Sequence, residues 1–142
     1  MTLYAESSAI LAWLFGEPHE EDVRECLGSA ELVVASDLTL VECERVLIRA
    51  TALGELAEAH AAGLRADLAT ASACWTLLKM AGDIVDRARR PFPLEPMRTL
   101  DALHLASALE ARRRIPGLAI LSLDSAIRDN ARAAGLDVCP AF

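Results

Sequence analysis

The sequence predicts a three-layer α/β/α fold in which a central, mostly parallel sheet of four to five short strands lies between helices. Short runs rich in Leu, Val, Ile and Ala alternate along the chain with longer segments whose apolar residues follow helical spacing. Such alternation joins parallel strands through crossovers, so helices cover both faces of the sheet. The 142 residues, 54% of them apolar and 4% aromatic, suffice for a single domain over residues 1–142 with an aliphatic core.

The strands are predicted where apolar runs are too short for a helix. Leu3-Tyr4-Ala5 and Leu32-Val33-Val34 are typical of buried strands, and Leu118-Ala119-Ile120-Leu121 is the clearest example, preceded by a turn at Pro116-Gly117. Strands are therefore expected over residues 3–5, 31–35, 75–80 and 118–121, with an edge strand over 137–139.

Helices are predicted between these strands. In the first, Ile10, Leu11 and Leu14 show helical spacing, and Ser7 and Ser8 are candidate N-caps. Further helices are expected over residues 20–27, 37–53, 55–73, 81–90, 99–114 and 125–134. The pair at about residues 37–73 forms a helical hairpin inserted between strands.

The helix that begins near Thr99 is apolar almost all round, so it belongs in the core. It nevertheless carries a carboxylate, Asp101, in its first turn. Burying an ionised carboxylate is costly unless a partner compensates it. One interpretation makes Thr99 the N-cap and Asp101 an acid that favours the positive end of the helix dipole. The other acids of the chain favour a functional interpretation.

The net charge and the positions of the cysteines exclude some classes of function. The net charge of −7 and a pI near 4.9 argue against broad electrostatic binding of nucleic acid, unless clustered acids are neutralised by metal cations. The four cysteines form no C-x-x-C pair and sit among apolar residues, which predicts small buried thiols rather than a zinc site: Cys26, Cys43, Cys74 and Cys139. Without a secretory signal, this pattern fits a reducing cytosol, and the apolar run 9–15 is too short to span a membrane.

Four acids that are distant in sequence are expected to meet at one edge of the sheet. Glu6 and Asp124 follow predicted strands, and parallel-sheet proteins bind ligands outside the carboxyl ends of their strands. Glu42 and Asp101 lie near the start of their helices. A local interpretation of Glu42 remains open, because Thr39-x-x-Glu42 matches a capping box and Glu42-x-x-Arg45 matches a surface ion pair.

Clustered carboxylates repel one another, and a hard divalent cation such as Mg²⁺ or Mn²⁺ removes the repulsion. One or two such ions can activate a water and stabilise in-line phosphoryl displacement, which outlines a metal-dependent nuclease site. The chain has no phosphate-binding glycine motif and no G-x-S-x-G. His104, one turn after Asp101, either orients that acid or contacts phosphate, or is a satisfied core histidine.

Four segments together resemble the PIN-domain family, and more narrowly the VapC-type toxins of toxin–antitoxin pairs. They cover nearly the whole chain in the family's order: Tyr4-Ala5-Glu6-Ser7-Ser8-Ala9, Leu38-Thr39-Leu40-Val41-Glu42, Arg98-Thr99-Leu100-Asp101-Ala102-Leu103-His104-Leu105-Ala106 and Ser122-Leu123-Asp124. The resemblance implies a Mg²⁺- or Mn²⁺-dependent endoribonuclease that cuts cellular RNA, a homodimer, and a cognate VapB-like antitoxin that holds it inactive.

The resemblance also assigns roles by position. Asp101 and Glu42 would hold the metal, Glu6 would share it and help activate water, and Asp124 would bind a second ion or orient the site through water. Ser8 and Ser122 match supporting hydroxyl positions, with His104 beside them. A basic group is expected to hold the RNA backbone, although its members also suit solvated helix ends: Arg87, Arg89, Arg90 and Arg98. Asp129 is expected to be an exposed helix residue.

Glu6 departs from the family pattern, in which the first acid is usually Asp. Because Glu is one methylene longer, a metal or water would shift unless the backbone compensates. Two alternatives therefore stay open. The first is a degenerate PIN domain that binds RNA or a protein partner without cleavage. The second is a protein-binding α/β domain whose acids are only caps and surface pairs. The RNA target, the choice of Mg²⁺ or Mn²⁺, and the number of ions are not encoded in any motif.

Overall fold

The computed structural model describes residues 1–142 and confirms the α/β class. Its five strands form one sheet in the order β3-β2-β1-β4-β5, and every pairing is parallel. β1 therefore lies at the centre. The strands are β1 (Thr2–Ala5), β2 (Leu32–Ser36), β3 (Thr76–Leu78), β4 (Ala119–Leu121) and β5 (Val138–Cys139).

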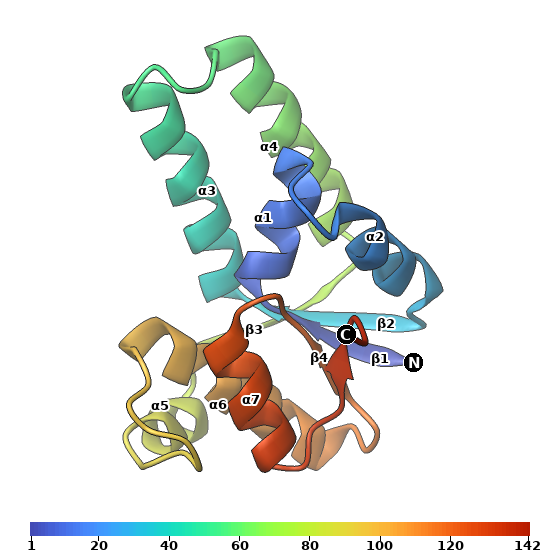
Figure 1. Cartoon of the computed structure of the whole chain (residues 1–142), viewed down its shortest axis with the longest axis vertical. Coiled ribbons are helices and arrows are strands. Elements are labelled where there is room, and N and C mark those ends of the chain that lie inside the picture. The colour runs from blue at the N-terminus through green and yellow to red at the C-terminus, as the bar shows by residue number, and fades with distance from the viewer.

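Two helical layers enclose the sheet, as predicted, with α1 to α4 on one side and α5 to α7 on the other (Figure 1). The first layer contains α1 (Ser7–Phe15), α2 (Glu20–Ser29), α3 (Asp37–Ala52) and α4 (Glu58–Ser72). The second contains α5 (Gly82–Ala88), α6 (Thr99–Arg114) and α7 (Ser125–Ala133). The expected helical hairpin corresponds to α3 and α4, which pack together and extend away from the sheet.

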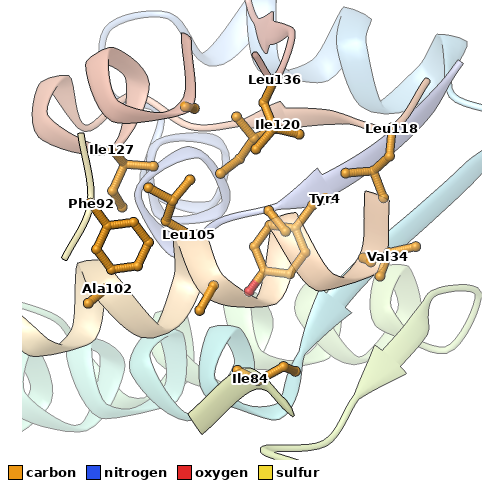
Figure 2. Close-up of a cluster of buried hydrophobic side chains, with 14 residues drawn as sticks. Tyr4, Val34, Ile84, Phe92, Ala102, Leu105, Leu118, Ile120, Ile127 and Leu136 are labelled. Carbon is orange, nitrogen blue, oxygen red and sulfur yellow. The ribbon is translucent and has the colours of Figure 1, made fainter. Parts of the chain in front are cut away.

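Alternation along the central strand divides the core between the two layers. Tyr4 points to the α6 side, where it joins the largest buried cluster together with Leu105 and Ile127 (Figure 2). Leu3 and Ala5 point to the opposite face, into clusters built with α1 to α4. This period of two is what a strand covered on both faces requires. The buried face of α6 packs into the same cluster, together with α5, α7 and the sheet.

The register of the sheet brings the carboxyl ends of its strands to one edge. Ala5 of β1 pairs with Leu121 of β4, so the residues that follow these strands start from the same level. The Glu6 backbone N–H extends the pairing by donating to the Leu121 carbonyl at 3.0 Å. β2 ends at Ser36, and α3 begins at the next residue. The residues that follow these strands, which include the predicted site residues, therefore begin at the same edge of the sheet.

Several local expectations were wrong. Glu6, rather than Ser7 or Ser8, is the N-cap of α1, and Arg98, rather than Thr99, precedes α6 without a side-chain cap. α3 is capped by Ser36, so the capping box at Thr39 does not form. Thr39 instead donates its hydroxyl to the Ala5 carbonyl at 3.0 Å. The Glu6 and Ser36 caps are local, and only for Thr39 does a contact with another element, β1, replace the expected local one.

The cysteines are less uniformly buried than expected. Cys43 is buried, Cys26 and Cys139 are partly exposed, and Cys74 is exposed at the end of α4. All four thiols are free. None of the helices has the length and apolar character that crossing a bilayer would require.

Candidate active site

A continuous set of contacts joins the four sequence-predicted acids at the carboxyl edge of the sheet. Glu6 follows β1, Glu42 lies in the second turn of α3, Asp101 in the first turn of α6, and Asp124 caps α7 after β4. Hydroxyl groups link Glu6 to Glu42 and to the segment that carries Asp124. Arg98 in turn links Asp124 to Asp101. The tertiary fold thus brings together residues from four separate elements.

Glu6 is the most buried of these acids, with 3% of its surface exposed, and its carboxylate accepts hydrogen bonds on both oxygens. Its Oε1 accepts from the Ser7 hydroxyl at 2.8 Å and from the Ser8 backbone N–H at 3.0 Å. Its Oε2 accepts from the Ser122 hydroxyl at 2.7 Å and from the Ser8 hydroxyl. These donors compensate the cost of burying the charge and hold the carboxylate in one position.

The two supporting serines also order the β4–α7 turn. The Ser8 hydroxyl oxygen accepts from the backbone N–H groups of Leu123 at 2.9 Å and Asp124 at 3.2 Å. Ser122 Oγ accepts from the Asp124 N–H at 3.2 Å as well. Asp124 uses Oδ1 to cap α7 by accepting from the Ile127 N–H at 3.0 Å, whereas Oδ2 faces Arg98. Ser8 and Ser122 therefore position both Glu6 and Asp124.

Arg98 forms an ion pair with both aspartates of the site. Its Nε donates to Asp101 Oδ2 at 2.9 Å, and an Nη atom donates to Asp124 Oδ2 at 3.4 Å. The hydrogen bond that Arg98 donates to Asp101, with the charges of Asp101 and Asp124, raises the pKa of the Arg98 guanidinium. The buried Asp101 therefore finds its compensating partner in an arginine one turn earlier, not in the helix cap.

Glu42 faces His104 across the site. Its Oε1 contacts His104 Nε2 and accepts from the Ser7 hydroxyl at 3.1 Å. Burial raises the pKa of the Glu42 carboxyl, but the hydrogen bond and charge of His104 and the Ser7 hydroxyl outweigh burial and leave the pKa below its ordinary value. Glu42 is therefore ionised at neutral pH.

His104 is a fully enclosed histidine with polar partners on both ring nitrogens. Its Nδ1 lies 3.0 Å from the Tyr4 hydroxyl, and its Nε2 faces Glu42 and lies 3.9 Å from Glu6 Oε1. Burial raises the pKa of Tyr4 well above its ordinary value, so the hydroxyl keeps its proton. These contacts fit the interpretation of His104 as a satisfied core histidine, and the acid that it orients is Glu42 rather than the expected Asp101. It does not contact Asp101.

The remaining basic residues lie away from the acids. The Arg87 guanidinium carbon lies over the Phe92 ring, 4.2 Å from its centroid. An Nη atom of Arg89 lies 4.0 Å from Asp86 Oδ1, and Arg90 is exposed just after α5. Of the four arginines expected to hold RNA, Arg98 alone contacts the acidic site. Asp129 is exposed and pairs with Arg132 on its own helix, as expected.

Sequence reasoning missed two buried polar residues of the site. Ser7 was considered only as a cap, yet its hydroxyl contacts Glu6, Glu42 and His104 Nε2, the last at 3.3 Å. Tyr4 was considered only as a strand residue. A signal for Ser7 existed, since a hydroxyl directly after a buried acid is well placed to donate to it. No sequence signal connects Tyr4 to a histidine 100 residues later.

The donor set fits a hard divalent cation in its chemistry, because it consists of carboxylate oxygens. As arranged here, no group of three or more histidine, cysteine, aspartate or glutamate side chains is placed to hold a metal ion. The acids face protein partners instead: Asp101 and Asp124 face Arg98, and Glu42 faces His104. Coordination of a cation by the Oδ2 atoms of the aspartates would therefore compete with Arg98.

Comparison with known proteins places this site in a family context. The family model described as PIN domain matches residues 3–133. Among curated proteins, the chain is 33% identical over 136 residues to Ribonuclease VapC46 of Mycobacterium tuberculosis. That match covers 96% of this chain and 95% of the relative.

Solved structures share the fold at low identity. VapC20 of Mycobacterium tuberculosis, described as a sarcin–ricin loop cleaving toxin, superposes with a TM-score of 0.63 at 17% identity and covers 94% of this chain and 95% of its own. VapBC2 from Rickettsia felis, bound to a DNA fragment from its promoter, superposes with a TM-score of 0.65 at 8% identity, and the match covers 97% of both chains. A toxin–antitoxin complex from Klebsiella pneumoniae superposes with a TM-score of 0.58 at 18% identity, and the match covers 90% of both chains.

Proposed function

The chain belongs to the PIN domain family, and from this premise we propose that it is a metal-dependent endoribonuclease toxin that cleaves cellular RNA. The observation that carries the proposal is the joining of Glu6, Glu42, Asp101 and Asp124 at one edge of the sheet. The similarity to Ribonuclease VapC46 along almost the whole chain supports the reaction class. The expected cofactor is Mg²⁺ or Mn²⁺.

Each acid has a distinct part in the proposed mechanism. Asp101 and Glu42 would hold the cation, since both are partly accessible at the edge of the site. Glu6, which is fixed by its hydrogen bonds, would share the cation and take a proton from the attacking water. Asp124 would hold a second cation or orient the site through water. When bound, the cation supplies Lewis acidity for the water nucleophile and offsets charge on the phosphate.

The supporting residues act by holding these acids in place. Ser8 and Ser122 fix the Glu6 carboxylate and the backbone of Asp124. His104 orients Glu42, and the buried Tyr4 hydroxyl orients His104. Preorganised groups of this kind reduce the reorganisation that the reaction requires.

We expect a protein partner and a second copy of the chain in the resting state. The proposed partner is a cognate VapB-like antitoxin, supported by structural neighbours that are toxin–antitoxin assemblies. A net charge of −7 suits a partner with a basic segment. The proposed resting complex resides in the cytoplasm and contains a homodimer of this chain. Coexpression with the neighbouring gene should yield a small copurifying protein.

The proposal is tested by incubating purified chain with total RNA in Mn²⁺, in Mg²⁺ and in EDTA. We expect discrete metal-dependent products from the wild type, and a loss of about a hundredfold or more in rate for Asp101→Asn, because a lost ligand weakens transition-state stabilisation. Asp129→Asn is the matched control, since Asp129 is an exposed acid outside the site. Equal cleavage by the wild type and Asp101→Asn would contradict the assignment.

One observation favours the second candidate function, binding without cleavage. Both oxygens of Glu6 are already engaged by protein donors, and Glu stands where the family usually has Asp. The variant Glu6→Asp separates the two functions. If Glu6 serves as proposed, the shorter acid loses hydrogen bonds and the cleavage rate changes by less than about tenfold. A rise of several hundredfold would show that the natural site is degenerate.

A further inference from the structure

Arg98 occupies an unusual position for a surface arginine. It precedes α6 and reaches over the first turn to Asp101, and also to Asp124, 26 residues further along the chain. Its own side chain is 78% exposed, whereas those of Asp101 and Asp124 are 12% and 25% exposed. The guanidinium thus bridges the two less exposed aspartates while the side chain as a whole remains largely in water.

The contacts of Arg98 compete directly with those expected of a cation. Nε and an Nη atom both use Oδ2 oxygens, one on each aspartate. Glu42 adds a smaller favourable charge interaction with the guanidinium. A divalent cation on these carboxylates would share their oxygens and would repel a guanidinium left beside it.

Arg98 is also free to leave. The side chain has no hydrogen bond to any residue other than these two aspartates. Ion pairs with a solvent-exposed arginine are weak, because water and salt screen the charges and ordering the long side chain costs entropy. The acids themselves are held more firmly, with Asp124 capping α7 and Asp101 fixed in buried α6.

We propose that Arg98 is an internal counter-ion that occupies the cation position of the acidic site in the metal-free chain and is displaced when a divalent cation binds. The inference rests on the proposed metal-dependent function and deepens it. Arg98 stabilises the two aspartates when no metal is present, and it sets the metal concentration at which the site fills. Binding of the metal releases the guanidinium towards solvent at the mouth of the site.

The first test measures Mn²⁺ binding by isothermal titration calorimetry on the full chain stripped with EDTA. Arg98→Gln is expected to bind Mn²⁺ roughly three- to tenfold more tightly than the wild type, the range that loss of a weak competing ion pair supplies. Arg98→Lys retains a cation and should lie between the two. Arg113→Gln is the matched control, because it removes the same charge from the far end of α6, where Arg113 pairs with Glu110.

Thermal unfolding of the same proteins separates this role from a merely structural one. In EDTA, Arg98→Gln should unfold at a lower temperature than the wild type, because Asp101 and Asp124 lose their counter-ion. In saturating Mn²⁺ the difference should disappear. A variant that is destabilised equally with and without Mn²⁺ would overturn the proposal.

A second measurement uses the wild-type chain and needs no stable Gln variant. The side-chain Nε–H of Arg98 gives an ¹⁵N resonance that Arg98→Lys lacks, which assigns it. Diamagnetic Mg²⁺ should move this resonance to the position of a solvated arginine. A resonance unchanged at saturating Mg²⁺ would overturn the displacement.

The outcomes distinguish failure of this inference from failure of the proposed function. If the wild type binds Mn²⁺ and Arg98→Gln binds it equally or less tightly, Arg98 is not a competitor, and the nuclease proposal is unaffected. If neither the wild type nor any variant binds Mn²⁺, both proposals are overturned.

Discussion

Glu42 shows how the surroundings of one residue decide its chemistry. The carboxyl is partly buried, which alone would raise its pKa, yet His104 and the Ser7 hydroxyl reverse the shift. Neither partner is local on the chain, since they lie 62 and 35 residues away. The capping-box and surface-pair interpretations fail because the side chain turns towards the site instead.

The lowered pKa of Glu42 predicts a defined pH dependence of stability in EDTA. A carboxyl whose pKa is depressed on folding stabilises the folded state above its unfolded pKa of about 4.5 and loses that contribution as the pH falls through the lower folded value. We expect the wild type to exceed Glu42→Gln in free energy of unfolding by about 1–2 kcal/mol near pH 5.5, since the acid accepts charged and neutral hydrogen bonds.

This advantage should shrink steadily below about pH 4.5. Urea unfolding of both proteins between about pH 3 and pH 5.5 measures it. Glu44→Gln serves as the control, because Glu44 is exposed on the same helix and should show no such trend. A difference in free energy of unfolding between the wild type and Glu42→Gln that stays constant across this pH range would contradict the assigned contact of Glu42 with His104.

At the scale of elements, the residues that cap two helices also supply acids of the site. Glu6 is the N-cap of α1 and Asp124 the N-cap of α7, and both acids also face the site. Free N–H groups at a helix start compensate carboxylates, so the fold can place acids at the sheet edge without an isolated buried charge. α6 differs, because Asp101 relies on Arg98 rather than on a cap.

The double task of Asp124 predicts that its structural and functional roles can be separated. Asn is as good an N-cap as Asp, so Asp124→Asn should keep the stability of the chain within about 0.5 kcal/mol, whereas Asp124→Ala should lose about 1 kcal/mol. Both variants remove the charge and should weaken cleavage and Mn²⁺ binding similarly. Thermal unfolding and RNA cleavage measured side by side test this, and a fully active Asp124→Ala would limit Asp124 to capping.

At the scale of the whole molecule, the parallel sheet makes the site. β1 is central, and its neighbours β2 and β4 deliver α3 and the Ser122–Asp124 turn to the same edge. Binding of a cation there should stabilise the complete fold, since its proposed ligands lie in or next to four separate elements. Ligand at a hundred times its Kd stabilises the native state by about 2.7 kcal/mol.

We therefore expect the unfolding temperature of the wild type to rise with Mn²⁺ concentration and to saturate. Asp101→Asn should show little or no rise, while Asp129→Asn should behave as the wild type does. Differential scanning calorimetry in matched buffers provides the measurement. A rise of the same size in Asp101→Asn would indicate that the cation binds elsewhere.

The amino-acid sequence alone determined the α/β class, the alternation of strands and helices, and the four acids expected at one edge, because hydrophobic periodicity and strand order are recorded locally along the chain. Element bounds were predicted to within a few residues, as for α4, expected over 55–73 and found over Glu58–Ser72. Only the tertiary structure decided the partners of each acid. The contacts of Arg98 with Asp124, of His104 with Glu42 and of Ser122 with Glu6 join residues from separate elements. Such contacts depend on how elements pack, and local periodicity does not encode them.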